Sequence, residues 1–119
     1  MDRAVRVASP EGELDISTVD EIDRVLQGVS TGDHMIIDLG RVSFVDSVTL
    51  SRFVRAARRH EAAGSRVILA DARGAVRRVL SITQLDAVLP YADDVTAARS
   101  LAASLDESSG TGQALFGGK

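Results

Sequence analysis

The chain has 119 residues, of which 45% are hydrophobic and 26% charged, a balance typical of one globular domain with a modest core. It contains no cysteine, which excludes disulfides, thiolate metal sites and a cysteine nucleophile. A formal net charge of −3 and an aromatic content of 3% disfavour nucleic-acid binders, which need a basic surface or stacking side chains.

In the first third of the chain, the pattern predicts a strand and then a helix. Residues 4–8 form a short strand that continues toward Leu14, and Pro10, which has no amide hydrogen to donate, favours a sheet edge or a bulge. Ser17 is a suitable N-cap for the helix, which ends at Gly28. The apolar residues that recur at helical spacing are Val19, Ile22, Val25 and Leu26.

The middle of the chain contains two strands followed directly by a long helix. Apolar runs predict strands over residues 35–39 and 42–45, separated by a turn at Gly40. The helix covers about residues 48–63, and Gly64 stands where a C-terminal cap is expected. One face of this helix carries Leu50, Phe53, Val54 and Ala57.

The last third again alternates strand and helix. Residues 66–70 form a β-branched strand, and residues 75–82 form a third helix. A short apolar segment over residues 85–89 ends at Pro90. An amphipathic helix follows over residues 93–105, and its inward residues are Val95, Ala98 and Leu101.

Strands that alternate with helices over short connections favour the α/β class. We expect a sandwich with a mixed β-sheet of about four strands and about four helices, mainly packed on one face. The domain covers residues 1–105, and residues 106–119 are rich in serine and glycine, so we expect a disordered tail there. Because no run of 18 apolar residues and no secretory signal occur, we expect a cytoplasmic protein with no membrane span.

The strongest functional signal is the pair Asp46-Ser47, between an apolar strand and the long helix. Ser47 stands at the mouth of that helix, where backbone N–H groups are unpaired and the helix dipole is positive. A phosphate on Ser47 would therefore change the local charge, and its own helix would stabilise it by about 0.3–1 kcal/mol. From the pattern alone, the simpler interpretations are an N-cap for Ser47 and a turn residue for Asp46.

Four segments resemble, in order and in spacing, motifs of the STAS domain family (sulfate transporter and anti-sigma factor antagonist). Residues 12–15 read G-E-L-D, which in the family closes an early strand. Residues 35–46 resemble the central strand-turn-strand, and residues 46–47 match the phosphorylatable D-S pair. Residues 76–85 resemble the third helix and its exit. The resemblance covers about residues 4–103 and implies a STAS-like α/β fold.

The resemblance also implies a function in partner switching. Single-domain members bind an anti-sigma factor, a serine kinase of the histidine-kinase-like ATPase type, and this binding releases a sigma factor. The kinase then phosphorylates the serine of the D-S pair, and a phosphatase resets the protein. The resemblance makes Ser47 the phosphorylation site. The residues expected to bind the partner are Asp15, Asp46, Ser47, Val48, Thr49 and Ser51.

Two alternatives stay open. Family members commonly read D-S-S/T-G-L-G, whereas residues 46–51 read D-S-V-T-L-S, with Thr49 in place of a glycine. This departure favours a STAS scaffold that is not phosphorylated, such as a subunit of a lipid-transport ATPase complex. An enzyme such as a nucleotide hydrolase has less support, because no G-x-x-x-x-G-K-S/T loop and no Ser-His-Asp spacing occur. We therefore expect no catalytic residue, cofactor or metal.

The remaining polar residues have structural interpretations. His34 and His60 are expected at the surface, and neither has a second histidine at metal-ligand spacing. Asp38 is expected to end a strand. The arginines expected to form a solvated helix face are Arg52, Arg55, Arg58 and Arg59.

Overall fold

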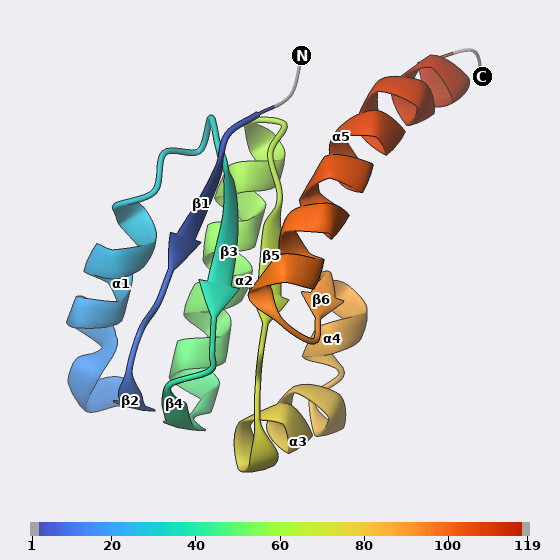
Figure 1. Cartoon of the computed structure of the whole chain (residues 1–119). Helices are drawn as coiled ribbons and strands as arrows, with labels where there is room; N and C mark the ends of the chain where they lie inside the picture. The colour runs from blue at the N-terminus through green and yellow to red at the C-terminus, as the bar shows by residue number, and fades with distance from the viewer. Residues whose placement is uncertain (1–2, 118–119) are drawn as a thin grey trace.

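The computed structural model describes residues 3–117, which form an α/β structure (Figure 1). The strands are β1 (Val5–Ala8), β2 (Gly12–Leu14), β3 (His34–Asp38), β4 (Val42–Val45), β5 (Val67–Ala70) and β6 (Tyr91–Ala92). The helices are the 3-10 turn η1 (Ile16–Thr18), α1 (Val19–Gln27), α2 (Ser47–Ala62), α3 (Gly74–Ile82), α4 (Leu85–Val88) and α5 (Val95–Gly117). The predicted alternation of strands and helices is confirmed, whereas η1 and β6 had no counterpart in the prediction.

The strands form one main sheet and one small sheet. In the main sheet β1, β3, β5 and β6 lie side by side in that order, and in the small sheet β2 pairs with β4. Every pairing in the described part of the chain is parallel. The expectation of a mixed sheet is wrong in this respect, because successive strands of the main sheet are joined through helices, and such crossovers leave them pointing the same way. The expected α/β class is confirmed, and the main sheet has the expected four strands.

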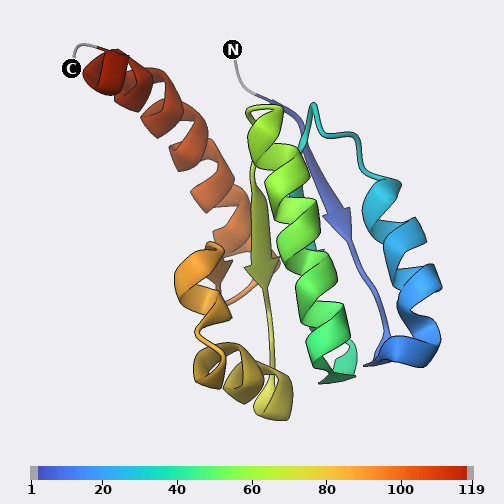
Figure 2. The same ribbon diagram turned by 180° about the vertical axis from the view of Figure 1, so that it is seen from behind.

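The helices cover the two faces of the main sheet unequally, as the two views in Figures 1 and 2 show. Helices α1 to α4 pack on one face, where Phe53 of α2 is fully buried. α5 packs on the opposite face, where its Ala98 lies in one cluster with Ile36. Successive side chains of a strand point to opposite faces, so Met35 and Ile37 face the larger core and Ile36 the smaller one. The expected packing of helices mainly on one face is confirmed.

Both histidines are buried near the amino ends of the strands, which corrects their expected surface positions. His34 begins β3 and is 1% exposed, and its Nδ1 accepts the amide hydrogen of Arg66 at 3.0 Å. Its Nε2 therefore carries the ring hydrogen and donates to Oδ1 of Asp106 at 2.6 Å. His60 of α2 is fully buried, with Nδ1 2.9 Å from the carbonyl oxygen of Asp33. Both ring nitrogens of His34 and Nδ1 of His60 have partners inside the fold, which the sequence does not reveal, whereas Nε2 of His60 has none among the described residues.

Helix α5 continues to Gly117, beyond the boundary expected at residue 105. Asp106, which the prediction placed in a disordered tail, belongs to the fold. Its carboxylate accepts hydrogen bonds from His34 and, at 3.1 Å, from the amide of Arg3. The predicted tail boundary is therefore wrong, because these bonds anchor α5 at this point and extending an existing helix is easier than starting one.

Candidate functional site

The site lies where β2 and β4 end side by side. Leu14, the last residue of β2, is paired with Val45, the last residue of β4. The amide of Asp46 donates to the carbonyl oxygen of Leu14 at 3.2 Å. Because both strands run in the same direction, the residues that follow them, Asp15 and Asp46, emerge at the same edge. Figure 1 places this edge at the opposite end of the molecule from the start of β1 and the end of α5.

Asp46 caps α2 and also holds the neighbouring turn. Its Oδ1 accepts the amide hydrogen of Thr49 at 2.9 Å, and its Oδ2 accepts the amide hydrogen of Ile16 at 3.0 Å. The hydrogen bond from Thr49 is the main reason that the pKa of this carboxyl lies below its ordinary value. Asp46 is therefore the N-cap of α2, a structural role in addition to the expected one.

Asp15 has the same capping role for the short turn η1. Its Oδ1 accepts the amide hydrogen of Ser17 at 2.9 Å and the hydroxyl of Ser17 at 2.5 Å. In return, the hydroxyl of Thr18 accepts the amide hydrogen of Asp15 at 3.0 Å. The prediction that Ser17 is the N-cap of the first helix is wrong, because Ser17 lies inside the turn η1, which Asp15 caps, and Thr18 occupies the N-cap position of α1.

Ser47 is the first residue of α2. The sequence predicted Ser47 as the N-cap, but the N-cap is Asp46, one residue earlier. Its side chain is exposed, and its hydroxyl takes part in none of the side-chain hydrogen bonds found in residues 3–106. Asp46 already caps the helix, so Ser47 is not needed for that purpose. The structure thus leaves a free serine hydroxyl beside two capping aspartates, Asp15 and Asp46.

The other residues expected to bind a partner differ in accessibility. Ser51 lies one turn after Ser47 on the exposed side of α2, and its hydroxyl donates to the carbonyl oxygen of Val48 at 2.6 Å. Val48 itself is half-buried. Thr49 is fully buried, and its Oγ1 has no hydrogen-bond partner. The expected contact between Thr49 and a partner is therefore wrong, because this position of α2 points into the core.

Two apolar residues near the site were not predicted to be exposed. Ile16, whose amide binds Asp46, is 69% exposed, and Phe44 of β4 is 48% exposed. The sequence contains a signal for Phe44: neighbouring residues of a strand point to opposite faces, so Phe44 and the buried Val45 cannot both face the core. Ile16 gives no such signal, because its position depends on the turn η1. Both residues add exposed apolar area near the ends of β2 and β4.

The described residues contain no site suited to a metal and no helix suited to a membrane. Between Arg3 and Gly117, no group of three or more Asp, Glu or His side chains is placed to hold a metal ion. In the same range, no helix is long and apolar enough to cross a membrane.

Sequence comparison places the chain in a family. The model of the STAS domain matches residues 2–98, which is most of the chain. The chain belongs to the STAS domain family. This result confirms the resemblance of its motifs. No curated protein matches the chain.

Solved structures with the same fold come from two kinds of STAS protein. A Thermotoga maritima protein, proposed to be an anti-sigma factor antagonist, superposes with a TM-score of 0.72 and 23% identity over 81% of this chain and 86% of its own. A sulfate transporter family protein from Wolinella succinogenes gives 0.72 and 18% identity over 87% of this chain and 88% of its own. The anti-sigma factor antagonist SpoIIAA, in its unphosphorylated form, superposes with a TM-score of 0.53 and 29% identity over 69% of this chain and 77% of its own. The STAS fold is thus shared by regulators and transporter domains.

Proposed function

We propose that this STAS domain is an anti-sigma factor antagonist that binds an anti-sigma factor kinase through the surface around Ser47. Binding releases a sigma factor, and phosphorylation of Ser47 ends the complex. The observation that carries this proposal is the exposed hydroxyl of Ser47, placed beside Asp15 and Asp46 at the start of α2. The similarity to SpoIIAA supports the assignment. We place the protein in the cytoplasm, where a phosphatase would restore the free hydroxyl.

The surface around Ser47 suits a switch that depends on charge. Phosphorylation adds about −1.5 to −2 charges next to two carboxylates that already cap neighbouring turns. Apolar Ile16 and Phe44, near the ends of β2 and β4, would be covered by a partner, which would take Ser47 out of water in the complex. Like charges brought together in such an interface cost several kcal/mol, and about 4 kcal/mol corresponds to a thousandfold loss of affinity. No change in the fold is required. The role is binding rather than catalysis.

The first prediction concerns a phosphate mimic at Ser47. We expect Ser47→Asp to weaken binding to the cognate anti-sigma factor at least about tenfold, the low end of the cost of an unfavourable charge in an interface. Ser47→Ala should bind as the natural protein does. Affinities are measured by calorimetry, and phosphate is mapped by mass spectrometry after incubation with the kinase and ATP.

A matched control is Ser100→Asp, which adds the same charge at an exposed residue of α5 on the opposite side of the sheet. This variant should retain full affinity. Equal affinities of Ser47→Asp and Ser47→Ala, or phosphate only at other residues, would contradict the proposal.

A second candidate function is a STAS scaffold that is not phosphorylated, such as a subunit of a transport ATPase complex. The equal TM-score with the sulfate transporter family protein supports it. The buried Thr49, at the position where family members commonly have glycine, also supports a change at this site. Affinity purification of the tagged protein separates the two: recovery of a transport ATPase subunit, with no phosphate on Ser47, favours the scaffold.

A further inference from the structure

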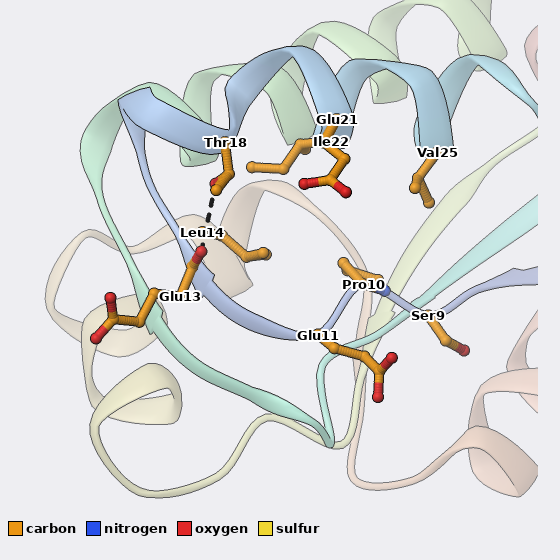
Figure 3. A pocket seen from close by; sticks show the side chains of 9 residues that line it. All are labelled: Ser9, Pro10, Glu11, Glu13, Leu14, Thr18, Glu21, Ile22 and Val25. Carbon is orange, nitrogen blue, oxygen red and sulfur yellow. Dashed lines mark hydrogen bonds between the residues drawn. The ribbon is translucent and has the colours of Figure 1, made fainter.

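The groove between α1 and the segment that joins β1 to β2 offers little surface to a ligand (Figure 3). Leu14 and Ile22 line it, and each is only 3% exposed. Figure 3 shows the carboxylate of Glu13 pointing away from this space. The outward face of α2, on the same side of the main sheet, is uncovered: Figure 2 shows this helix at the front of the molecule, with α1 beside it.

One line of exposed side chains runs along α2 from its first residue. It consists of Ser47, Ser51, Arg55 and Arg58, which are all exposed and which we call the α2 stripe. Residues three or four positions apart lie on the same side of a helix, so these four side chains are neighbours in turn. Because a helix rises 1.5 Å per residue, Arg55 lies about 12 Å along α2 from Ser47. The stripe therefore begins at the proposed switch and continues into two arginines.

Positive charge is concentrated on this helix, although the chain as a whole has a formal net charge of −3. α2 contains one acidic residue, Glu61, and four arginines: Arg52, Arg55, Arg58 and Arg59. Glu61 lies 3.6 Å from Arg66, and Arg52 lies 3.6 Å from Asp23 of α1. The other three arginines of α2 have no ion-pair partner among the side chains of residues 3–106. Arg55 and Arg58 are exposed, as the sequence predicted, whereas Arg52 and Arg59 are half-buried.

Arginines elsewhere in the fold are arranged differently. Several lie within 3.6 Å of a carboxylate oxygen: Arg6, Arg41, Arg66, Arg73 and Arg77. Those without such a partner in the same range occur one to a helix, with Arg24 on α1, Arg78 on α3 and Arg99 on α5. Among the described side chains, arginines without a carboxylate therefore lie together on α2.

The size of a protein interface connects these arginines to the site at Ser47. A stable interface covers about 800 Å² of each partner, which as a circle has a radius of about 16 Å. A partner centred on Ser47 would therefore also cover Arg55. An arginine that is covered without an opposing carboxylate loses its hydration and gains nothing in return, so an interface at this place needs acidic groups.

Carboxylates of a protein suit the α2 stripe better than the phosphates of a nucleic acid. The planar guanidinium of arginine binds a carboxylate through two parallel hydrogen bonds. A nucleic-acid backbone is negative along its whole length, and Asp15 and Asp46 at the start of the same helix would repel it. A protein surface can instead place its acidic groups opposite Arg55 and Arg58 alone.

We propose that Arg55 and Arg58 bind an acidic segment of the protein partner that covers Ser47. This inference rests on the proposed function for the identity of the partner, and it adds the chemistry of the partner's surface. Opposite charges on the two surfaces would speed association, particularly at low salt. A phosphate on Ser47 would lie on the same stripe as the acidic segment, so one feature of the partner would favour both binding and release.

The first test uses a peptide as a probe and does not involve a kinase. The ¹⁵N-labelled full chain is titrated with acetyl-Glu-Glu-Leu-Glu-Glu-amide, and amide chemical shifts are followed by NMR. We expect saturable shifts that are largest over residues 51–59. The same peptide with glutamine in place of glutamate should bind more weakly, and raising the salt concentration should reduce this difference, since exposed charges are screened.

Two double variants test the arginines. In Arg55→Gln/Arg58→Gln, the loss of two exposed ion pairs should weaken peptide binding by about 2- to 30-fold. The control Arg78→Gln/Arg99→Gln removes the same charge from exposed residues of α3 and α5, and it should leave peptide binding nearly unchanged. With the cognate anti-sigma factor, stopped-flow measurements at low salt should show slower association for the α2 variant and not for the control.

Three results would overturn the proposal: peptide shifts as large around Arg78 and Arg99 as on α2, equal binding of the two peptides, or an unchanged affinity in the α2 variant. None of them depends on whether Ser47 accepts phosphate. An anti-sigma factor that does not bind at all would contradict the proposed function, while the peptide would still decide whether the α2 stripe takes an acidic segment. The two proposals can therefore fail independently.

Discussion

The hydrogen bonds that hold the site together are made by the side chain of Asp46 and not by that of its neighbour Ser47. One of its carboxylate oxygens caps α2, and the other binds the amide of Ile16 in the adjacent turn. The amide of Thr49, which a phosphate on Ser47 could otherwise have used, is therefore occupied. The expected stabilisation of the phosphate by its own helix must be smaller than the sequence suggested. A phosphorylated Ser47 instead adds charge beside Asp46, which favours a switch that acts on the partner.

Among single residues, His60 gives the clearest pH dependence. Burial lowers its pKa below the ordinary value of 6.5, although the carbonyl oxygen of Asp33 partly opposes this shift. Its Nε2 is buried without a hydrogen-bond partner. The folded protein therefore keeps the ring neutral, whereas the unfolded chain takes up a proton as the pH falls below about 6.5. Folding stability must decrease as the pH falls through this range.

The prediction is that His60→Asn reduces this dependence. Asparagine can still donate to the carbonyl of Asp33 but does not titrate. The free energy of unfolding, measured by urea titration between pH 7.5 and 5, should fall by at most about 1.4 kcal/mol per pH unit because of His60. In the variant the stability at pH 7.5 should be lower and this slope smaller. Equal slopes in both proteins would contradict the assignment.

At lower pH a second loss is expected from two carboxyl groups. Hydrogen bonds lower the pKa of Asp46, chiefly the bond from Thr49. Burial alone would raise the pKa of Asp106, but hydrogen bonds from His34 and Arg3 outweigh it and leave the pKa below its ordinary value. A carboxyl group with a lowered pKa stabilises the fold above about pH 4 and loses this effect as the pH falls further. Both groups therefore act in the same direction as His60.

The candidate site could be predicted from the sequence only in part. G-E-L-D and D-S identified Asp15, Asp46 and Ser47 as neighbours, because the family pattern contains information on how β2 and β4 pair. Accessibility did not follow from the pattern. The burial of Thr49 and the exposure of Ile16 depend on where α2 and η1 begin, and a shift of one residue rotates a helical side chain by about 100°.

At the scale of the elements, α2 connects the site to the opposite end of the molecule. It begins at Ser47 with an aspartate cap and ends before Gly64, which has a φ of +89°. The predicted C-terminal cap at Gly64 is confirmed. Arg3 lies against this glycine and donates to the carbonyl oxygen of Ala63 at 3.2 Å. A cation close to the last carbonyls of a helix is favourable, so this contact stabilises the end of α2.

The prediction for this element is that Gly64→Ala lowers the free energy of unfolding by about 1–2 kcal/mol, the cost of left-handed backbone for a residue with a Cβ atom. The new Cβ atom would also lie 2.6 Å from Nη2 of Arg3 and displace its side chain. Gly64→Asn is the matched control, because asparagine adopts this conformation more easily. It should be less destabilised in urea unfolding. Alanine with the stability of the natural protein would disprove the assignment.

Elements were more predictable than their connections. Long apolar or amphipathic segments such as β3 and α2 are repeated patterns that the sequence displays directly. The pairing direction of the strands is not such a pattern, and β6, with two residues, is too short to have one. The extent of α5 was missed for another reason: Asp106 has its partners in β3 and near β1, which are distant in the sequence.

On the scale of the whole molecule, α5 is attached by a small polar cluster at the end remote from Ser47. His34 and the amide of Arg3 both donate to Asp106. This cluster joins the starts of β1 and β3 to the helix that covers the smaller core. The apolar part of that contact consists of the buried Ala98 and Ala102 together with the partly buried Val95, Leu101 and Leu105. The cluster adds polar bonds to this apolar contact at one point of α5.

The corresponding prediction is that Asp106→Ala loosens α5. It leaves the buried Nε2–H of His34 without an acceptor, which should cost about 1–3 kcal/mol of unfolding free energy. Amide hydrogen exchange over Val95–Leu105 should become faster, and exchange in β3 should change less. Ser104→Ala, at an exposed position of the same helix, is the control and should have little effect. Unchanged exchange in α5 after the Asp106 substitution would refute this role.

The opposite placement of Ser47 and the two ends of the described chain has a practical consequence. The strand β1 begins, and α5 ends, at the far end of the molecule from the β2–β4 edge (Figure 1). A fluorescent reporter could be fused before β1 or after α5 without covering Ser47. A tag at either of these ends could also hold the protein on a biosensor chip with Ser47 facing the bulk solution. Tethered copies should therefore display the same recognition surface as freely diffusing ones.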